Sequence, residues 1–315
     1  MRAEFELPEQ GRADAPPVSL AIGSFDGVHV GHKRVLAAAV EDARNRGGEA
    51  AVLTFEPHPR CVLDPDRCPL SLTTLDEKHD RLAAEGIDRL IVLAFTKGLS
   101  RLSAERFCER LCTALPLASL VVGPDFALGS ERRGDVAYLR DYGAHHGFEV
   151  VSVDAARDGY QPISSSRVRV ALLEGSSEEA NRLLGHPYFV DAWVEHGDGI
   201  GARIGFPTAN LAITPNKCLP ARGVYATWTR VRGVWHVGAT NVGYRPTFGG
   251  ETLTMETHLL DFDEDIYRER VRSVFVARLR DERTYPDAQT LCAQIEKDVG
   301  KTRALLDGTP PPAGL

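Results

Sequence analysis

His29 and His32 lie three positions apart in the stretch GSFDGVHVGH, which covers residues 23–32. An apolar run precedes this stretch and a helical pattern follows it, so both imidazoles are expected where a strand passes into a helix N-terminus. Free N–H groups attract anions there, and imidazoles can donate hydrogen bonds to phosphate oxygens as charge grows in a transition state. Two alternatives stay open from these residues alone. One is a metal site, for which no third ligand is evident, and the other is a capped turn with surface histidines.

Two further patterns could carry chemistry. ISSSRVR (163–169) places serines at a predicted helix start and adds Arg167 and Arg169 as donors suited to a triphosphate, although a plain helix cap fits equally well. In the glycine-rich GDGIGARIGFPTANL (197–211), Thr208 and Asn210 would point the same way and could bind Mg²⁺, although a simple hairpin loop is the alternative.

The first half of the chain must position the histidines. Continuous apolar runs at 18–22, 50–55, 89–95, 119–123 and 148–153 alternate with helical patterns. Such runs are typical of strands buried on both faces, so they predict an α/β fold with a doubly wound parallel sheet. Ligands of these sheets bind beyond the carboxyl ends of the strands, which is where the histidines are expected.

The second half shows a different pattern. Alternating strands are predicted at 188–196, 223–231, 234–242, 252–260 and 272–280, with glycine- and proline-rich turns between them. They favour an antiparallel barrel or sandwich, followed by a helix at about 287–306. The predicted domains are therefore residues 1–185 and 186–315.

Composition narrows the class of protein. The 315 residues are 43% hydrophobic and 26% charged, and the net charge of −7 argues against a nucleic-acid partner that depends on overall basicity. No run resembles a signal peptide or approaches the length of a membrane span, so we expect a cytoplasmic protein without a membrane partner. The cysteines are expected to be free thiols, as in a reducing compartment: Cys61, Cys68, Cys108, Cys112, Cys218 and Cys292.

Several stretches carry a resemblance to a known family. GSFDGVHVGH resembles the HxGH signature of nucleotidyltransferases, and TFEPHPR, VVGPDFALGSERRGD and ISSSRVR follow it in order. GHPYFV, PTANL, GVYA, NVGYRPTFG, METHLLDFDEDIY and ARLRDERTYPD then follow in the order of a riboflavin kinase module. Together they resemble the prokaryotic bifunctional riboflavin kinase/FAD synthetase family. The resemblance implies a nucleotidyltransferase domain followed by a six-stranded Greek-key barrel with a C-terminal helix.

The resemblance also implies two reactions. The C-terminal domain would phosphorylate riboflavin with ATP to FMN, and the N-terminal domain would adenylylate FMN with ATP to FAD and pyrophosphate, with Mg²⁺ in both. Glu256 would be the base of the kinase and take the hydroxyl proton, although a glutamate on an alternating strand can also be only a solvent-facing charge. His29 and His32 would stabilise charge at the α-phosphate. The implied ATP- and phosphate-binding residues are Gly23, Phe25, Asp26, Gly31, Ser164, Ser165, Ser166, Arg169, Gly205, Pro207, Thr208 and Asn210. Thr208 and Asn210 would hold the metal, and the implied flavin-binding residues are Asp125, Phe126, Arg132 and Arg280.

The chain departs from the family pattern at Ala127, Leu128, Ala202, Arg245 and Arg268. Ala127 and Leu128 stand where a basic and an aromatic residue are usual, which removes an anion contact and a stacking surface. Arg268 stands at a glycine position, where a positive φ would cost about 1 kcal/mol or more. These changes keep three alternatives open: a paralogue with one degenerate module, an enzyme for a modified flavin, or a non-enzymatic flavin-binding protein. The oligomeric state stays open as well.

Overall fold

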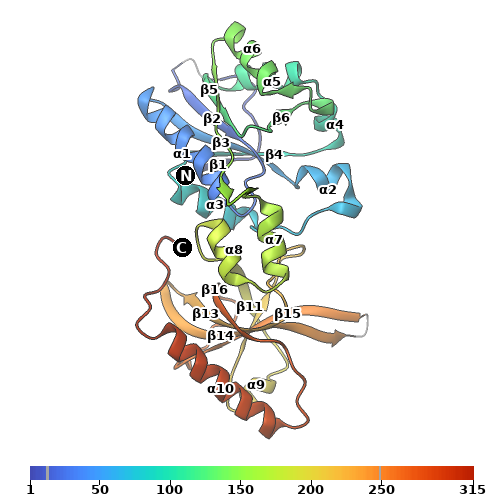
Figure 1. The fold of residues 1–315 in the computed structure, drawn as a ribbon, viewed down its shortest axis with the longest axis vertical. Coiled ribbons are helices and arrows are strands. Elements are labelled where there is room, and N and C mark those ends of the chain that lie inside the picture. The colour runs from blue at the N-terminus through green and yellow to red at the C-terminus, as the bar shows by residue number, and fades with distance from the viewer. Residues whose placement is uncertain (12–13, 248–249) are drawn as a thin grey trace. The chain divides into compact units, whose positions relative to one another are not determined.

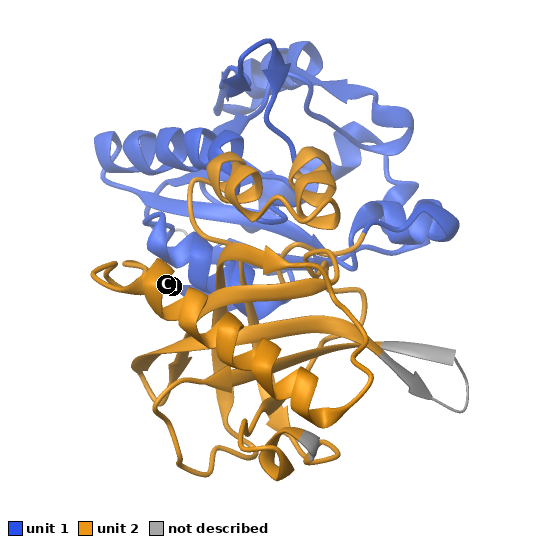
Figure 2. Cartoon of the chain, turned by 60° about the horizontal axis from the view of Figure 1, so that its bottom comes forward, with its two compact units in different colours: residues 1–69, 75–164 blue, residues 70–74, 165–315 orange. Residues whose placement is uncertain are grey.

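The computed structural model describes residues 1–11, 14–247 and 250–315. The chain packs as two compact units (Figures 1 and 2). Unit 1 comprises Met1–Pro69 and Leu75–Ser164, and unit 2 comprises Leu70–Thr74 and Ser165–Leu315. The two units are defined by contacts within the fold. The division into catalytic domains of residues 1–185 and 186–315 stays a prediction.

Unit 1 is built on a six-stranded sheet in which every pairing is parallel, with the order β1-β4-β3-β2-β5-β8. The predicted doubly wound α/β fold is therefore confirmed. Its strands are β1 (Arg2–Glu4), β2 (Val18–Ile22), β3 (Glu49–Glu56), β4 (Arg89–Ala94), β5 (Leu117–Val122) and β8 (Glu149–Ser152). Its helices are α1 (Val30–Asn45), α2 (Pro59–Leu63), α3 (Leu75–Ala84), α4 (Lys97–Ser100), α5 (Ala104–Ala114) and α6 (Val136–His146). Short elements complete it: η1 (Pro65–Arg67), β6 (Ala127–Leu128), η2 (Ser130–Arg132), β7 (Gly134–Asp135), β9 (Arg157–Asp158) and β10 (Gln161–Pro162).

The central strands of the unit 1 sheet are continuously apolar because each of their faces packs against a helical layer. Leu20 lies in a core that includes Phe107 of α5. The next residue, Ala21, lies in a second core that includes Leu36 of α1. Successive side chains of a strand point to opposite faces, so an apolar residue is needed at every position rather than at every second one.

Unit 2 contains a closed barrel with the order β11-β12-β15-β14-β13-β16, and all its pairings are antiparallel. The barrel is therefore confirmed and the sandwich alternative is wrong. Its strands are β11 (Phe189–Glu195), β12 (Ala209–Ala212), β13 (Gly223–Val231), β14 (Val234–Thr247), β15 (Gly250–Leu259) and β16 (Arg270–Arg280). Its helices are α7 (Ser165–Leu173), α8 (Ser177–Leu184), α9 (Ile200–Arg203) and α10 (Ala288–Leu306). Helix α10 is the predicted C-terminal helix.

The two-residue strands β6, β7, β9 and β10 have no counterpart in the sequence analysis, and neither do one strand of the six-stranded sheet and one strand of the barrel. Strand β1 has three residues, and its side chains are mostly exposed, so it shows no apolar run. Strand β12 has four residues and follows directly from the glycine-rich loop. Both are too short for a period of two to be visible, and pairing with neighbours that are distant in sequence defines them.

The expectation that all cysteines are free thiols is wrong for one pair. A disulfide joins Cys61 and Cys68, whose Cα atoms lie 4.3 Å apart. Cys108, Cys112, Cys218 and Cys292 are free. Helix α2 and the following 3₁₀ turn fold the six residues between these cysteines back on themselves, and nothing in the spacing indicates that turn.

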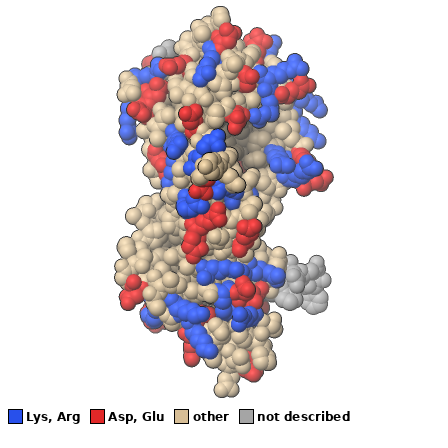
Figure 3. Space-filling model, viewed as in Figure 1, with Lys and Arg blue, Asp and Glu red and all other residues tan. Residues whose placement is uncertain are grey.

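The surface carries both signs of charge. Figure 3 shows Lys and Arg side chains interspersed with Asp and Glu side chains on the face in view. Within the part of the chain that the structure describes, none of the helices combines the length and the apolar character that crossing a bilayer requires.

Candidate active sites

The two histidines lie at the start of α1, directly after the carboxyl end of β2. His29 is the N-cap of the helix, and its Nδ1 accepts a hydrogen bond from the backbone N–H of His32 (3.3 Å). The rings of His29 and His32 stack, with their centroids 3.6 Å apart and an angle of 15° between the planes. Because Nδ1 of His29 acts as the acceptor, the proton of the neutral ring is on Nε2. The pair thus places imidazole N–H groups beside the free backbone donors of the helix.

The pKa of His32 is held well below its usual value. Burial is the main cause, and the positive charges of His29 and Lys78 act in the same direction. The Nδ1 atom of His32 is buried and has no hydrogen-bond partner among the described residues. His32 is therefore a neutral hydrogen-bond donor at pH 7.

Lys78 of α3 adds a positive charge that the sequence analysis did not identify. Its side chain is 5% exposed. Burial lowers its pKa, while the carboxylates of Asp26 and Glu56 act in the opposite direction. A buried lysine in an otherwise ordinary amphipathic helix has no signature in the sequence, so only packing shows that it belongs to this site.

Close packing explains the glycine of the HxGH motif. A Cβ at Gly31 would lie 3.0 Å from Cε1 and 3.1 Å from Nδ1 of His29. Any side chain at position 31 would therefore push His29 away from its capping position. Phe25 and Asp26, two other predicted residues of the loop, are also buried, and the structure brings them together with Gly23, Gly31 and the two histidines.

The predicted flavin-binding segment forms a small hairpin. The carbonyl of Asp125 accepts a hydrogen bond from Nη2 of Arg132 (2.8 Å), and Phe126 packs on the core of unit 1. Leu128 is 8% exposed and belongs to that core, so this position offers no stacking surface to a ligand. The leucine at position 128 is thus a core residue, and the effect of Ala127 and Leu128 on flavin binding stays a prediction.

The ISSSRVR stretch spans the border between the two units. Ser164 ends unit 1, whereas Ser165, Ser166 and Arg169 belong to unit 2, where α7 begins at Ser165. Within unit 2, Nε of Arg169 donates to the carbonyl of Leu70 (2.5 Å). Each unit thus contains part of the predicted phosphate-binding set, and the binding role of these four residues stays a prediction.

The second cluster lies in the barrel, where β12 pairs with β15. Asn210 pairs with Glu256 in the register of the ladder, and Ala209 pairs with Thr257. The hydroxyl of Thr208 donates to Oε2 of Glu256 across 3.4 Å. A hydroxyl, an amide and a carboxylate from widely separated positions therefore meet at one end of this strand pair.

The absence of a side chain at Gly197 leaves room for the amide of Asn210. A Cβ at Gly197 would lie 2.1 Å from Nδ2 and 2.5 Å from Oδ1 of Asn210. The amide occupies the space that a side chain at position 197 would need, so Gly197 supports the cluster without taking part in its chemistry.

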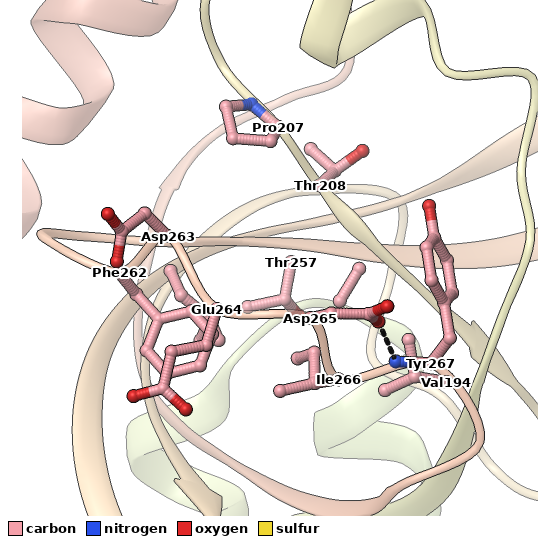
Figure 4. Close-up of a pocket in the computed structure, with 12 residues that line it drawn as sticks. Val194, Pro207, Thr208, Thr257, Phe262, Asp263, Glu264, Asp265, Ile266 and Tyr267 are labelled. Carbon is pink, nitrogen blue, oxygen red and sulfur yellow. Dashed lines mark hydrogen bonds between the residues drawn. The ribbon is translucent and has the colours of Figure 1, made fainter.

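Two pockets meet at Thr208. The first, of about 340 Å³, is lined by Val194, Pro207, Thr208, Ala209, Thr257, Leu259, Phe262, Asp263, Glu264, Asp265, Ile266 and Tyr267 (Figure 4). The second, of about 280 Å³, contains Glu256 and Arg280 together with apolar side chains that include Phe206, Leu291 and Ile295. Thr208 is the lining residue that the two pockets share. Gly205 has φ of +88° and directly precedes residues 206–208, which lie between the two pockets.

Arg280 lines the second pocket, and an ion pair fixes its guanidinium. Nε and Nη2 of Arg280 bind Oδ2 of Asp298 at 2.8 and 2.7 Å. Oδ1 of Asp298 accepts a hydrogen bond from Gln294 (2.9 Å). Nη1 of Arg280 donates to the carbonyl of Asp281 (2.9 Å). The guanidinium is therefore held at the pocket wall by α10 and by the backbone after β16.

The remaining positions at which the chain departs from the family pattern are Arg268, Ala202 and Arg245. Arg268 has φ of +63°, so the strain expected at this glycine position is present. Ala202 is exposed in the short helix α9. Arg245 lies in β14, but its side chain lies outside the part of the chain that the structure describes.

The sequence analysis did not identify several residues that line the second pocket. His258, Asn241 and Tyr285 line it together with Asp298. A period of two from Glu256 points to His258 on the same face of β15, so that residue could have been found. Asn241 and Asp298 lie in elements that are distant in sequence from Thr208. They reach the second pocket only because the barrel closes and helix α10 packs against it.

Comparisons with known proteins match both halves of the chain. A family model described as FAD synthetase matches residues 12–167, and one described as riboflavin kinase matches residues 184–306. A bifunctional riboflavin kinase/FMN adenylyltransferase of Listeria monocytogenes is 40% identical over 90% of this chain and 91% of its own length. The enzyme of that name from Escherichia coli is 36% identical over 93% and 94%.

A solved structure supports the fold of the whole chain. It is a crystal structure described as a macrolide-efflux protein from Streptococcus pneumoniae, with a TM-score of 0.85 at 31% identity. The match covers 96% of this chain and 99% of that chain. From both family matches and from relatives matched over nearly their full length, we conclude that the chain belongs to the bifunctional riboflavin kinase/FMN adenylyltransferase family.

Proposed function

We propose that the barrel performs the kinase reaction at Thr208, Asn210 and Glu256, with the acceptor in the second pocket and ATP in the first. The observation that carries this proposal is that the two pockets meet at Thr208. A general base must reach the hydroxyl that it deprotonates, so the pocket containing Glu256 takes the riboflavin. Its apolar side chains suit an isoalloxazine ring. Phe262 and Tyr267 of the other pocket suit the flat base of ATP.

The kinase step then follows from this placement. The ribityl 5′-hydroxyl oxygen attacks the γ-phosphorus of ATP, the bond to the β,γ-bridging oxygen breaks, and ADP leaves. Glu256 takes the hydroxyl proton. FMN and ADP are the products, and no covalent intermediate on the protein is needed.

The donor set fits a magnesium ion. Mg²⁺ prefers oxygen ligands, and the Thr208 hydroxyl and the Asn210 amide oxygen lie next to the Glu256 carboxylate. When bound, the ion would neutralise charge on the phosphates of ATP. Asn210 would be held for this purpose against Gly197.

For the adenylyltransferase, we infer that the start of α1 binds the α-phosphate of ATP. A phosphate oxygen of FMN attacks the α-phosphorus, and the bond to pyrophosphate breaks. His29 and neutral His32 donate hydrogen bonds to the α-phosphate oxygens, and Lys78 contributes positive charge. Ser164, Ser165, Ser166 and Arg169 would bind the remaining phosphates, and Asp125, Phe126 and Arg132 would face the flavin. A cytoplasmic location, where ATP is abundant, belongs to the same proposal.

Product analysis with paired variants tests the assignment. Purified protein is incubated with ATP, Mg²⁺ and either riboflavin or FMN, and flavins are separated by chromatography. Glu256→Gln should abolish FMN formation but keep FAD formation from FMN, and His29→Ala should do the reverse. Glu296→Gln and His145→Ala are matched controls at exposed positions. If Glu256→Gln and His29→Ala both turn over normally, the site assignments are wrong.

A further inference from the structure

His258 lies on β15 two residues beyond Glu256 and lines the same pocket. Its Nδ1 lies 2.8 Å from the carbonyl oxygen of Pro207. A carbonyl oxygen can only accept, so Nδ1 of His258 carries the proton and donates. The imidazole is also packed edge-on against Phe206, with the ring centroids 5.6 Å apart and an angle of 78° between the planes.

Phe206, Pro207 and Thr208 form the wall between the two barrel pockets. Phe206 lines the pocket that contains Glu256, Pro207 lines the other pocket, and Thr208 lines both. The β12–β15 ladder begins only at Ala209, which pairs with Thr257. The wall thus precedes the ladder, and the His258 side chain ties it to the strand that carries Glu256.

We propose that His258 is a positioning residue for the kinase reaction. By holding the Pro207 carbonyl, it keeps the hydroxyl of Thr208 against the carboxylate of Glu256 and keeps the donor and acceptor pockets aligned. This inference rests on the kinase site proposed above. It assigns His258 no contact with substrate, and its effect is transmitted through Pro207 to Thr208.

The hydrogen bond between His258 and Pro207 fixes the position of Thr208, whose own hydrogen bond to Glu256 is long. The Thr208 hydroxyl reaches Oε2 of Glu256 at 3.4 Å, which is close to the limit for a hydrogen bond. A small displacement of the Pro207–Thr208 peptide would separate these groups. Misplacement of reacting groups by about 1 Å can reduce a rate by roughly 100-fold.

Two variants separate the hydrogen bond from the bulk of the ring. His258→Phe keeps a ring against Phe206 but removes the donor, and His258→Asn removes the ring but places an amide N–H near the position of Nδ1. We expect His258→Phe to lower kcat for riboflavin phosphorylation roughly 10- to 100-fold, with a smaller change in KM for riboflavin. His258→Asn should recover most of this loss. FMN adenylylation measured on the same preparations should stay at the wild-type rate.

Two outcomes would overturn the proposal. One is wild-type kcat in His258→Phe, and the other is an equal loss in both variants, which would show that restoring a hydrogen-bond donor at position 258 does not restore the rate. Glu256→Gln, assayed in parallel, tests the underlying site. If Glu256→Gln is inactive as a kinase while His258→Phe is fully active, only the role of His258 fails. If Glu256→Gln keeps kinase activity, the proposed kinase site itself is wrong.

Discussion

Two nitrogens of Arg280 bind a single carboxylate oxygen of Asp298, and this ion pair joins the last barrel strand to the C-terminal helix. The Asp298 side chain is 3% exposed and that of Arg280 is 13% exposed. The pair forms part of the wall of the pocket that contains Glu256. Helix α10 therefore contributes to the binding surface as well as to packing.

Asp298→Asn should destabilise the barrel by about 3 kcal/mol, because it leaves Arg280 largely buried without its counter-charge. It should also weaken riboflavin binding, since the guanidinium is no longer held at the pocket wall. The three tryptophans, Trp193, Trp228 and Trp235, all lie in barrel strands, so urea unfolding followed by their fluorescence reports on this unit. Unchanged unfolding together with unchanged riboflavin binding would contradict the prediction.

Gly197→Ala tests the support of Asn210. The added methyl group would occupy the place of the Asn210 amide, so that side chain must move away from Glu256. We expect kinase activity to fall roughly 10-fold or more while the barrel stays folded. Gly300→Ala is the control, because a Cβ there meets no atom within 4 Å. The measurement is riboflavin phosphorylation at saturating ATP, and equal activity in both variants would rule out the proposed support.

Arg268→Gly should stabilise the barrel. Arg268 has φ of +63°, a conformation that costs an ordinary residue about 1–2 kcal/mol, and glycine's larger entropy loss on folding offsets about 0.5–1 kcal/mol of the gain. The expected net gain is therefore about 0 to 1.5 kcal/mol in the free energy of unfolding. Arg268→Ala removes the same side chain but keeps the strain, so tryptophan fluorescence should show no comparable gain for it. A gain of the same size in both variants would assign the effect to the side chain.

Acidification should weaken unit 1 through Asp42. Burial works to raise the pKa of this carboxyl, but hydrogen bonds from Arg46, Ser119 and Ser19 outweigh it and hold the pKa below its usual value. The unfolded chain therefore binds this proton more readily than the folded chain does. The stabilising contribution is present above about pH 4 and is lost as the pH falls through the depressed pKa of the folded state.

Thermal unfolding followed by circular dichroism measures this contribution. Asp42→Asn should lower the midpoint at pH 6, and the difference from the wild type should shrink as the pH approaches 3. A difference that stays constant between pH 6 and 3 would show that the charge of Asp42 does not stabilise the fold.

Local patterns predicted most of the fold. Continuous apolar runs indicated strands buried on both faces, and alternation indicated strands with one buried face, because the period of side chains along a strand is two. The HxGH stretch was placed correctly at the strand–helix junction, since helix termini have local capping signals. Strands β1 and β12 were missed because three or four residues are too few to show a period.

Local preference and side-chain periodicity specify the two architectures, the start of α1 and the residue types available for chemistry, so these features can be predicted from the amino-acid sequence. The burial of Leu128 in the core, the position of Lys78 near His32 and the hydrogen bond between His258 and Pro207 arise only when the chain folds. The disulfide between Cys61 and Cys68 also depends on the folded loop. These relationships join residues through the closure of a barrel, the docking of a helix or the reversal of a loop, and such long-range contacts leave no period in the chain.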